Sequence, residues 1–511
     1  MDVEKTEVRQ MMEAMKLPAD QMASLELAAY KPVFELNKRF DDTIAKMREN
    51  QKKLENKEAC LDMCTFVEEK NNGKQEIKIA IGGCADFLMM KYPMVTFRDD
   101  CSTWYFHDSF YRKDIESLIK REVSAVLKTD EWNHDILRTG HIKEILMQIQ
   151  AKTFFERAVF EPPLELVPCI NGILDITTGE MVPYMPSYFF HSPIGASFLK
   201  DATCPAFLKF LSEILDAGDI PLIQEMFGYC LYRKYLFHKA FMLLGGGSNG
   251  KSTLLNVLKV FLGSGNHVDV ALQSIEENRF SAARLVGKMA CISDDLSDRA
   301  LQSTGTFKQL TGESSLGVEQ KFREGFDFLN YAKLIYSANK LPETNDITVA
   351  FFRRWAIVNF SRVFNAATAD PKMFEKITTE EELSGILNWA LVGLQKLLQT
   401  NLFSAQITPE EMEIKYQKLS SSLIAFLYDC VVADSDNNVS KEDFYNAYTK
   451  YCSSTHTPPK TKDWVGKHLP RYSAVTEMVS NQLGARIRAW KGIRLLSLNE
   501  RVVNPQNILI I

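Results

Sequence analysis

The sequence has no apolar run long enough to cross a membrane, and its first residues are polar and charged. We therefore expect neither a transmembrane helix nor a secretory signal. An excess of positive charge is also lacking, because 60 Lys and Arg stand against 65 Asp and Glu, for a formal net charge of −5. This balance excludes a molecule that binds nucleic acid over its whole surface, so any such contact must use a local basic patch.

No C-x-x-C pair occurs among the ten cysteines, which are scattered along the chain. A disulfide framework is therefore not expected, and we predict reduced core thiols in a cytosolic protein. The closest pair is Cys60 and Cys64. These two could bind zinc with a distant histidine, but no second ligand pair is visible, which argues against a zinc site.

The most specific pattern lies between Phe241 and Thr253, where G-x-x-x-x-G-K-[ST] is matched in full. A short apolar run precedes the glycines, and apolar residues at helical spacing follow them. Strand, glycine turn and helix together predict a loop whose backbone N–H groups surround a polyphosphate. A glycine-rich turn that binds nothing is the alternative, and the full motif in this context argues against it.

We expect ATP and Mg²⁺ as the ligands of this loop. Lys251 would reach the β- and γ-phosphates, and Ser252 would bind the metal. The predicted nucleotide-binding residues are Gly245, Gly246, Gly247, Ser248, Asn249, Gly250, Lys251, Ser252 and Thr253.

Two carboxylates, Asp294 and Asp295, follow a second short apolar run. An acidic pair at the end of a strand can hold Mg²⁺ through one member and polarise the attacking water through the other. We assign Asp294 to the metal and Asp295 to the water. The reverse division stays open, and so does a helix N-cap role for one of them.

Further along the chain, Asn339 ends a third apolar run, and Arg353 and Arg354 precede a fourth. The amide of Asn339 can hydrogen-bond the γ-phosphate or the water without adding charge. The arginines are either surface residues or include a finger that stabilises charge on a neighbouring subunit's γ-phosphoryl group, which requires an oligomer. The predicted catalytic residues are thus Lys251, Asp294, Asp295, Asn339, Arg353 and Arg354, with either arginine as the finger.

These motifs, in this order, resemble those of superfamily 3 helicases. The stretches that carry the resemblance are Gly245–Ser252, Ile292–Asp295, Phe307–Gly312, Ser337–Pro342 and Arg353–Arg354. Outward from them, Asn171–Asp175, Glu225–Tyr229 and Leu383–Leu391 resemble the phage/plasmid primase and poxvirus-type primase-helicase family. The resemblance covers roughly residues 80 to 500. One departure is the Asp294-Asp295 pair, where a glutamate is common in the family.

The resemblance implies an ATP-driven, ring-forming DNA helicase, usually hexameric, that replicates the DNA of a virus, phage or plasmid. The expected location is the cytoplasm, of the host cell where the gene is viral or phage-borne. Family members often carry an N-terminal primase domain, but residues 1–75 are too short for one. The adjacent carboxylates Asp99 and Asp100 lack further metal-binding partners, which favours a solvated turn. A separate primase or polymerase is therefore a candidate partner.

The expected fold is α/β, with an AAA+-like P-loop ATPase core between an N-terminal α+β domain and a C-terminal winged-helix-like domain. We predict a helical leader over 1–75, the α+β domain over 76–205, the core over 206–400 and a helical and winged-helix module over 401–511.

Two stretches are predicted to contact DNA. Between Leu316 and Phe328, apolar residues flank a polar tip, and the resemblance implies a hairpin in the ring channel. Lys321 and Arg323 there would bind phosphates, and Phe322 would stack on a base or sugar. Residues 460–494 are locally basic, and their predicted contacts are Arg486, Arg488 and Lys491. A plain surface hairpin and a solvated basic face are the alternatives.

Three functions stay open at this point. The first is a replicative helicase that acts on single-stranded and forked DNA. The second is an ATP-gated initiator or loader that melts DNA without processive unwinding. An ATPase that acts on protein ranks last, because no module for a protein substrate is visible.

Overall fold

The structure of the chain is a computed structural model that describes residues 54–497, apart from 129–135, 279, 320–324, 345, 366–369, 405–406, 456 and 483–484. The chain divides into two compact units. The first runs to Phe198 and also holds Gly263–Asn266 and Gly317–Asp327. The second holds Leu199–Leu262, His267–Leu316 and the chain from Phe328 onward.

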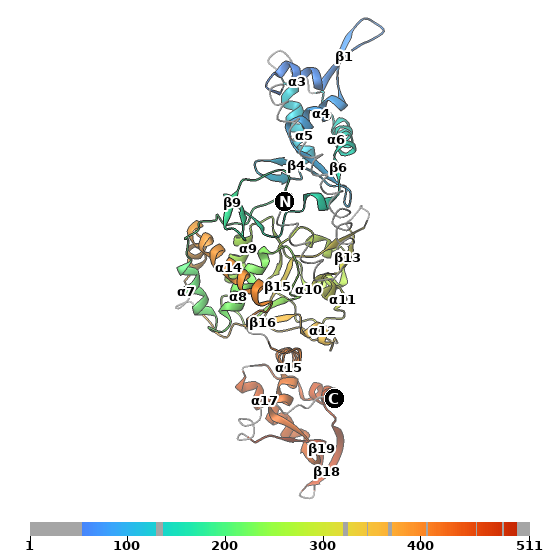
Figure 1. Ribbon diagram of the computed structural model, residues 1–511. Coiled ribbons are helices and arrows are strands. Elements are labelled where there is room, and N and C mark those ends of the chain that lie inside the picture. The colour runs from blue at the N-terminus through green and yellow to red at the C-terminus, as the bar shows by residue number, and fades with distance from the viewer. Residues whose placement is uncertain are drawn as a thin grey trace, which may run out of the picture. The chain divides into compact units, whose positions relative to one another are not determined.

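The first unit contains a cluster of helices around its own apolar core (Figure 1). The helices are α3 (Lys57–Cys64), α4 (Ile81–Lys91), α5 (Ile115–Leu127) and α6 (Thr139–Thr153). Leu88, Leu118 and Ile145 are fully buried between them. In α5 and α6, apolar residues recur at helical spacing and form the buried faces of the helices.

A two-stranded hairpin follows α3, with strands β1 (Thr65–Glu69) and β2 (Gln75–Ile79). The helix expected up to residue 75 is therefore wrong for β1. The turn contains Asn72-Gly73, and Gly73 has a φ of +72°. Asn-Gly between two strand-forming runs favours a hairpin, and this local preference decides the structure. Residues 1–53 of the predicted leader lie outside the described part of the chain.

Two small sheets complete the first unit. One has the order β5-β4-β3-β6 and the other the order β7-β8-β9. Asn171-Gly172 and Thr178-Gly179 lie at turns, each of which joins two antiparallel strands. The elements are β3 (Met94–Phe97), β4 (Thr103–His107), β5 (Phe110–Arg112), β6 (Phe154–Phe155), the 3₁₀ turn η1 (Arg157–Phe160), β7 (Leu166–Cys169), β8 (Gly172–Asp175) and β9 (Glu180–Val182).

A five-stranded sheet with the order β11-β12-β15-β10-β16 forms the centre of the second unit, and all its neighbouring strands are parallel. The strands are β10 (Ala240–Leu244), β11 (His267–Val268), β12 (Ala290–Ser293), β15 (Lys333–Ala338) and β16 (Trp355–Asn359). Every residue of β10, β12 and β15 is buried. Continuous apolar runs are what a strand covered on both faces requires.

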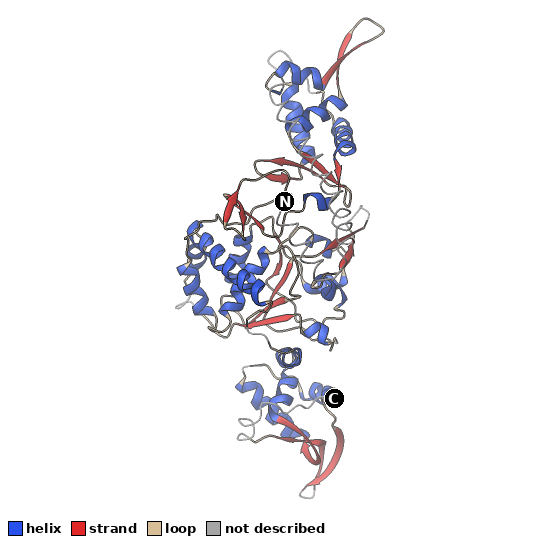
Figure 2. Ribbon diagram, viewed as in Figure 1, coloured by secondary structure: helices blue, strands red, loops and turns tan. Residues whose placement is uncertain are grey.

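Helices cover both faces of this sheet, as Figures 1 and 2 show. One side carries α7 (Pro205–Ile214), α8 (Ile220–Leu231), α9 (Lys251–Leu262) and α14 (Glu380–Thr400). The other carries α10 (Leu272–Glu277), α11 (Gly305–Leu310) and α12 (Val349–Phe352). The helices α8 and α14 cross closely, because a Cβ on Gly228 would lie 2.3 Å from the carbonyl oxygen of Ala390. The short segments η2 (Ala282–Leu285) and α13 (Met373–Ile377) join these elements.

Residues after α15 (Pro409–Ser420) form a group with its own core, in which Phe426, Phe444 and Trp490 are buried. Its helices are α16 (Ser422–Cys430), α17 (Lys441–Ser454) and α18 (Lys462–Tyr472), and its sheet has the order β17-β19-β18. The strands are β17 (Val431–Ser440), β18 (Thr476–Gln482) and β19 (Ala485–Leu495). Ser440 caps α17, since its side chain accepts from the Asp443 N–H. In the part of the chain that the structure describes, no helix is both long enough and apolar enough to span a membrane.

Candidate functional site

The loop from Gly245 to Gly250 joins β10 to α9 at the edge where the parallel strands end. The strand β10 lies between β15 and β16 in the sheet. The φ angles of Gly247, Ser248 and Gly250 are +100°, +48° and +86°. Residues that carry a Cβ rarely adopt positive φ angles, which explains why glycine recurs in this loop. The predicted succession of strand, turn and helix is present.

The loop is fixed to the segment that follows β16. The Asn249 side-chain Nδ2 donates to the carbonyl oxygen of Phe360 at 3.3 Å, and the Phe364 N–H donates to the Ser248 carbonyl oxygen at 2.7 Å. A Cβ on Gly245 would lie 2.6 Å from the same Phe360 oxygen. The loop is thus held against the segment that follows β16 and needs glycine for the close approach.

Lys251 is the first residue of α9, and its ammonium group folds back over the loop. Its Nζ donates to the carbonyl oxygen of Gly245 at 2.5 Å and to Asn249 Oδ1 at 3.0 Å. Burial lowers the pKa of Lys251. Ser252 is exposed and Thr253 is half-buried in the same first turn. The loop and the first turn of α9 therefore place the Lys251 ammonium group and the exposed Ser252 hydroxyl at this edge of the sheet.

The predicted acidic and amide residues lie at the same edge. Asp294 and Asp295 follow β12, and Asn339 follows β15, the strand between β12 and β10. Asp294 is half-buried and accepts from Lys259 Nζ of α9 at 3.2 Å, whereas Asp295 and Asn339 are exposed. The sheet thus brings together the loop, the acidic pair and the amide, as expected when parallel strands end side by side.

The oxygen donors at this edge suit Mg²⁺. A hydroxyl at Ser252 and a carboxylate at Asp294 are hard ligands, and Mg²⁺ usually takes one or two protein ligands together with phosphates and water. Among the described residues, no three His, Cys, Asp or Glu side chains cluster so that they could hold a metal by themselves. An ion here would depend on a bound polyphosphate for most of its ligands.

The two predicted arginines have different surroundings. Arg354 is buried, and its guanidinium donates to Thr311 Oγ1 at 2.8 Å, to the Lys308 carbonyl oxygen at 3.3 Å and to the carbonyl oxygen of Ala350. Arg353 is exposed. Only Arg353 can therefore reach another molecule without breaking internal hydrogen bonds.

The predicted DNA-contacting tip, with Lys321, Phe322 and Arg323, lies outside the described residues. The strands on either side of it, β13 (Ser315–Val318) and β14 (Phe326–Leu329), pair with each other as a two-stranded sheet. A hairpin around this tip is thus confirmed, although its contacts remain predictions.

The basic residues predicted near the C-terminus belong to β19. Arg488 and Lys491 are exposed there. The backbone of Arg486 pairs with Asn481 of β18, and its side chain lies outside the described part. Trp490, which lies between Arg488 and Lys491 in the sequence, is buried. Lys441 Nζ lies 4.1 Å from the centre of the Trp490 ring.

Sequence reasoning missed two cations at the site. Lys259 pairs with Asp294, and Arg362 lies in the segment fixed to the loop. The Arg362 guanidinium donates to the carbonyl oxygen of Ser212 and lies 3.6 Å from the carboxylate of Asp216. Ser212 lies in the last turn of α7, and Asp216 follows this helix. The Ile214 side chain of α7 also leaves no room for a Cβ on Gly250. No local pattern could reveal either cation, because each pair joins distant segments.

Comparison with known proteins adds independent information. A family model described as D5 N terminal like matches residues 85–216. A family of unknown function, DUF5906, matches residues 243–354. Over 393 residues, the chain is 23% identical to "Putative helicase L207/L206" of Acanthamoeba polyphaga mimivirus.

The chain is similar to a viral helicase-type protein. The alignment covers 70% of this chain and 40% of that relative, so the chain spans less than half of the relative's length. The D5 N-terminal-like match and this similarity each cover only a part of the proteins compared.

Among solved structures, two of the NrS-1 C-terminal region are similar to this chain. "The A form apo structure of NrS-1 C terminal region-CTR" has a TM-score of 0.42 at 11% identity and covers 80% of this chain and 98% of that one. "The apo structure of NrS-1 C terminal region (305-718)" has a TM-score of 0.41 at 12% identity, with the same coverage.

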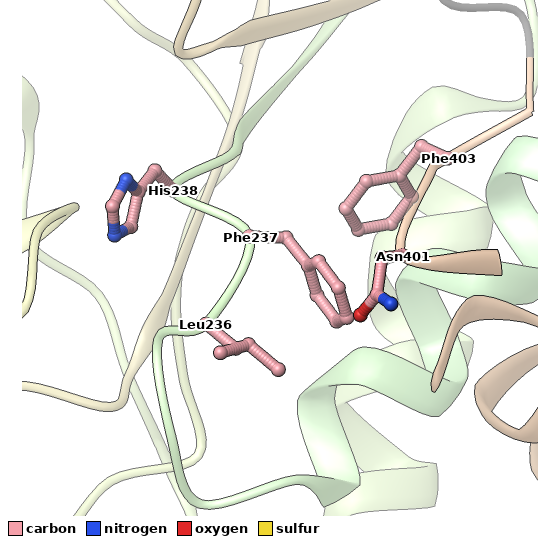
Figure 3. A pocket seen from close by; sticks show the side chains of 5 residues that line it. All are labelled: Leu236, Phe237, His238, Asn401 and Phe403. Carbon is pink, nitrogen blue, oxygen red and sulfur yellow. The ribbon is translucent and has the colours of Figure 1, made fainter. Parts of the chain in front are cut away.

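A cavity of about 290 Å³ lies away from this site and contains none of the predicted site residues. It is lined by Leu236, Phe237, His238, Asn401 and Phe403 (Figure 3). The Phe237 and Phe403 rings meet edge to face with their centres 5.7 Å apart, and the His238 imidazole points away from them. Three of its lining residues, Leu236 to His238, precede β10 in the chain, whereas the glycine loop follows the other end of that strand.

Proposed function

We propose that this chain is one subunit of an ATP-driven DNA helicase of the superfamily 3 type, which replicates the DNA of a virus, phage or plasmid. The observation that carries the proposal is the glycine loop with its inward-folded Lys251, at the edge where Asp294 and Asn339 also lie. The helicase similarity of the chain supports the same reading.

In this proposal the triphosphate of ATP lies on the loop from Gly245 to Thr253, in an AAA+-like core. Lys251 leaves its internal acceptors and binds the β- and γ-phosphates. Ser252 and Asp294 would hold Mg²⁺, which would supply positive charge to the phosphates. Asp295 polarises the attacking water, Asn339 hydrogen-bonds the water or the γ-phosphate, and Lys259 holds the Asp294 carboxylate in position.

Arg353 supplies the finger to a neighbouring copy, so we propose a homo-oligomeric ring, with six subunits as the expected number. Because the finger and the loop belong to different copies, each nucleotide lies at an interface. Hydrolysis at that interface requires both subunits.

DNA contacts in this proposal come from two places. Lys321, Phe322 and Arg323 at the hairpin tip hold the translocating single strand. The C-terminal group acts as a winged-helix-like module that holds duplex through Arg486, Arg488 and Lys491, and the exposure of the last two supports this role. A separate primase or polymerase would extend the exposed strand, in the cytoplasm of the host cell.

The test is strand displacement on a forked DNA duplex with ATP and Mg²⁺. We expect the unaltered chain to separate the strands and Lys251→Ala to lose this activity while keeping its circular dichroism spectrum. Lys143→Ala is the matched control, because Lys143 is an exposed lysine on α6. Unwinding by Lys251→Ala at the control rate would refute the proposal.

A second candidate is an ATP-gated initiator or loader, favoured by the separate core of the C-terminal group. A change of both Lys321 and Arg323 to alanine separates the two functions. A helicase should lose strand displacement but keep duplex binding, whereas a loader should keep its ATP-dependent melting of a short duplex.

A further inference from the structure

The short helices α11 and α12 are joined by hydrogen bonds at two points. At the first, Asp346 accepts from the Thr304 hydroxyl, from Lys308 Nζ at 2.9 Å, and from the backbone N–H and hydroxyl of Thr348 at 2.9 and 2.6 Å. Thr304 and Lys308 belong to the start and middle of α11, and Thr348 caps α12. Burial raises the pKa of Asp346, but these hydrogen bonds outweigh it and hold the pKa well below its usual range.

The second point is Arg354, which follows α12 and binds the other end of α11. Its three acceptors are Thr311 Oγ1, the Lys308 carbonyl oxygen and the Ala350 carbonyl oxygen. Thr311 caps the C-terminus of α11, where carbonyl groups lack helical partners and a cation is favoured. The guanidinium thus ties α11 to α12 in a geometry that only a planar fork of donors can provide.

Apolar contacts close the same interface. The Phe307 ring of α11 stacks on Trp355 with centres 4.8 Å apart and contacts Phe351 of α12. Phe307, Phe351 and Trp355 are all buried. With polar links at both ends and stacked rings between them, α11 and α12 should move as one rigid block.

The chain leaves this block at two points, after α11 toward the β13–β14 hairpin and after α12 toward Arg353. The chain leaves α11 through Thr311 into the hairpin β13–β14, and returns at Asn330, whose Nδ2 donates to the carbonyl oxygen of Leu310 at 2.8 Å. At the other exit, α12 is followed directly by the exposed Arg353. The base of the hairpin and the exposed arginine are therefore attached to one body.

We propose that Arg354 is a positioning residue that couples Arg353 to the β13–β14 hairpin, so that a shift of either one displaces the other. This inference rests on the proposed function, in which Arg353 contacts a neighbour's nucleotide and the hairpin contacts DNA. Arg354 itself binds neither. DNA on the hairpin then changes the position of Arg353, and thereby the rate of ATP hydrolysis.

The test compares ATP hydrolysis by the full chain with and without single-stranded DNA. Arg354→Lys keeps the charge but cannot reach three acceptors, and Thr311→Val removes one acceptor from a fully buried site at nearly constant volume. We expect Thr311→Val to keep basal hydrolysis and DNA binding. Both variants should lose DNA stimulation by about fivefold or more, the usual lower range of coupling between sites. Thr311→Ser, which retains the hydroxyl, should be stimulated like the unaltered chain.

The double variant Arg354→Lys/Thr311→Val should be no worse than either single variant, because both break one link. Normal stimulation in Arg354→Lys and Thr311→Val would overturn the coupling but leave the proposed function intact. Equal loss of basal and stimulated hydrolysis would assign these residues a purely structural role and overturn the coupling as well. An unaltered chain that hydrolyses no ATP would overturn the proposed function, and the coupling with it.

Discussion

Lys251 and Arg353 lie at opposite edges of the same parallel sheet. Lys251 begins the helix that follows the carboxyl end of β10, whereas Arg353 lies two residues before the start of β16, and Ala240 of β10 pairs with Trp355 of β16. Five residues of parallel strand separate the two edges by about 16 Å. An arginine side chain cannot bridge this distance, so Arg353 cannot serve the nucleotide loop of its own subunit. If it acts on a nucleotide, that nucleotide belongs to another copy.

The two neighbouring arginines should differ sharply in their effect on stability. We expect Arg354→Ala to lower the free energy of unfolding by about 2–4 kcal/mol, because it leaves buried acceptors of α11 and α12 without donors. Arg353→Ala should change it by no more than about 0.5 kcal/mol, because the side chain is exposed. Urea denaturation followed by tryptophan fluorescence measures both. Equal destabilisation would contradict the contacts of Arg354.

Lys333 should make stability depend on pH in the alkaline range. It is fully buried in β15, where its Nζ donates to the carbonyl oxygens of Tyr232, Lys234 and Tyr331. Burial lowers its pKa to about 7. Between that value and the pKa of an unfolded lysine, about 10.4, the unfolded chain binds more protons than the folded one, so stability rises with pH.

The control for this prediction is Lys333→Met, which has similar length and no charge. Between pH 7.5 and 10, the unfolding free energy of the unaltered chain should increase relative to that of Lys333→Met. We expect this increase to reach up to about 1.4 kcal/mol per pH unit. Below pH 7 the difference between the two proteins should be constant. Parallel curves throughout the range would show that Lys333 stays charged in the folded chain.

Arg362 should support nucleotide binding rather than the chemical step. Residues on both sides of it are hydrogen-bonded to the glycine loop, and its own partners Ser212 and Asp216 end or follow α7. Loss of a hydrogen bond from a charged group costs about 1.5–3 kcal/mol, so Arg362→Ala should weaken ATP binding by about tenfold or more. The kcat should change little.

Arg299→Ala is the matched control for Arg362. Arg299 is also exposed and ion-paired, with Glu277 at 2.7 Å, but it lies outside the loop and the segments fixed to it. Titration with a fluorescent ATP analogue measures the affinity of each variant. If both variants bind the analogue like the unaltered chain, Arg362 has no part in the site.

Local patterns predicted the parts of the fold that depend on nearby residues. The apolar run 240–244, the glycines after it and the helical spacing beyond them lie within a few residues of one another, and the predicted strand, turn and helix are present. The parallel order of the strands then placed Asp294 and Asn339 at one edge. The hairpin at Asn72-Gly73 could have been predicted from its turn residues, but the charged composition of the leader obscured it.

Contacts between distant segments could not be predicted. Arg362 and Ser212 are 150 positions apart, and Lys259 and Asp294 are 35 apart. Nothing in the dipeptide Arg353-Arg354 indicates which arginine is buried. That difference depends on Thr311 and Lys308, which approach Arg354 only after α11 has packed on the sheet.

The claim that a nucleotide is shared between copies is tested most directly by mixing two inactive variants. Lys251→Ala lacks the loop cation, and Arg353→Ala lacks the exposed arginine, so each should hydrolyse almost no ATP alone. A mixed oligomer contains interfaces that combine an intact loop from one copy with an intact arginine from the other. We predict that ATP hydrolysis returns when the two are mixed and peaks near equal amounts. No recovery at any ratio, from variants that still assemble with the unaltered chain, would contradict the account.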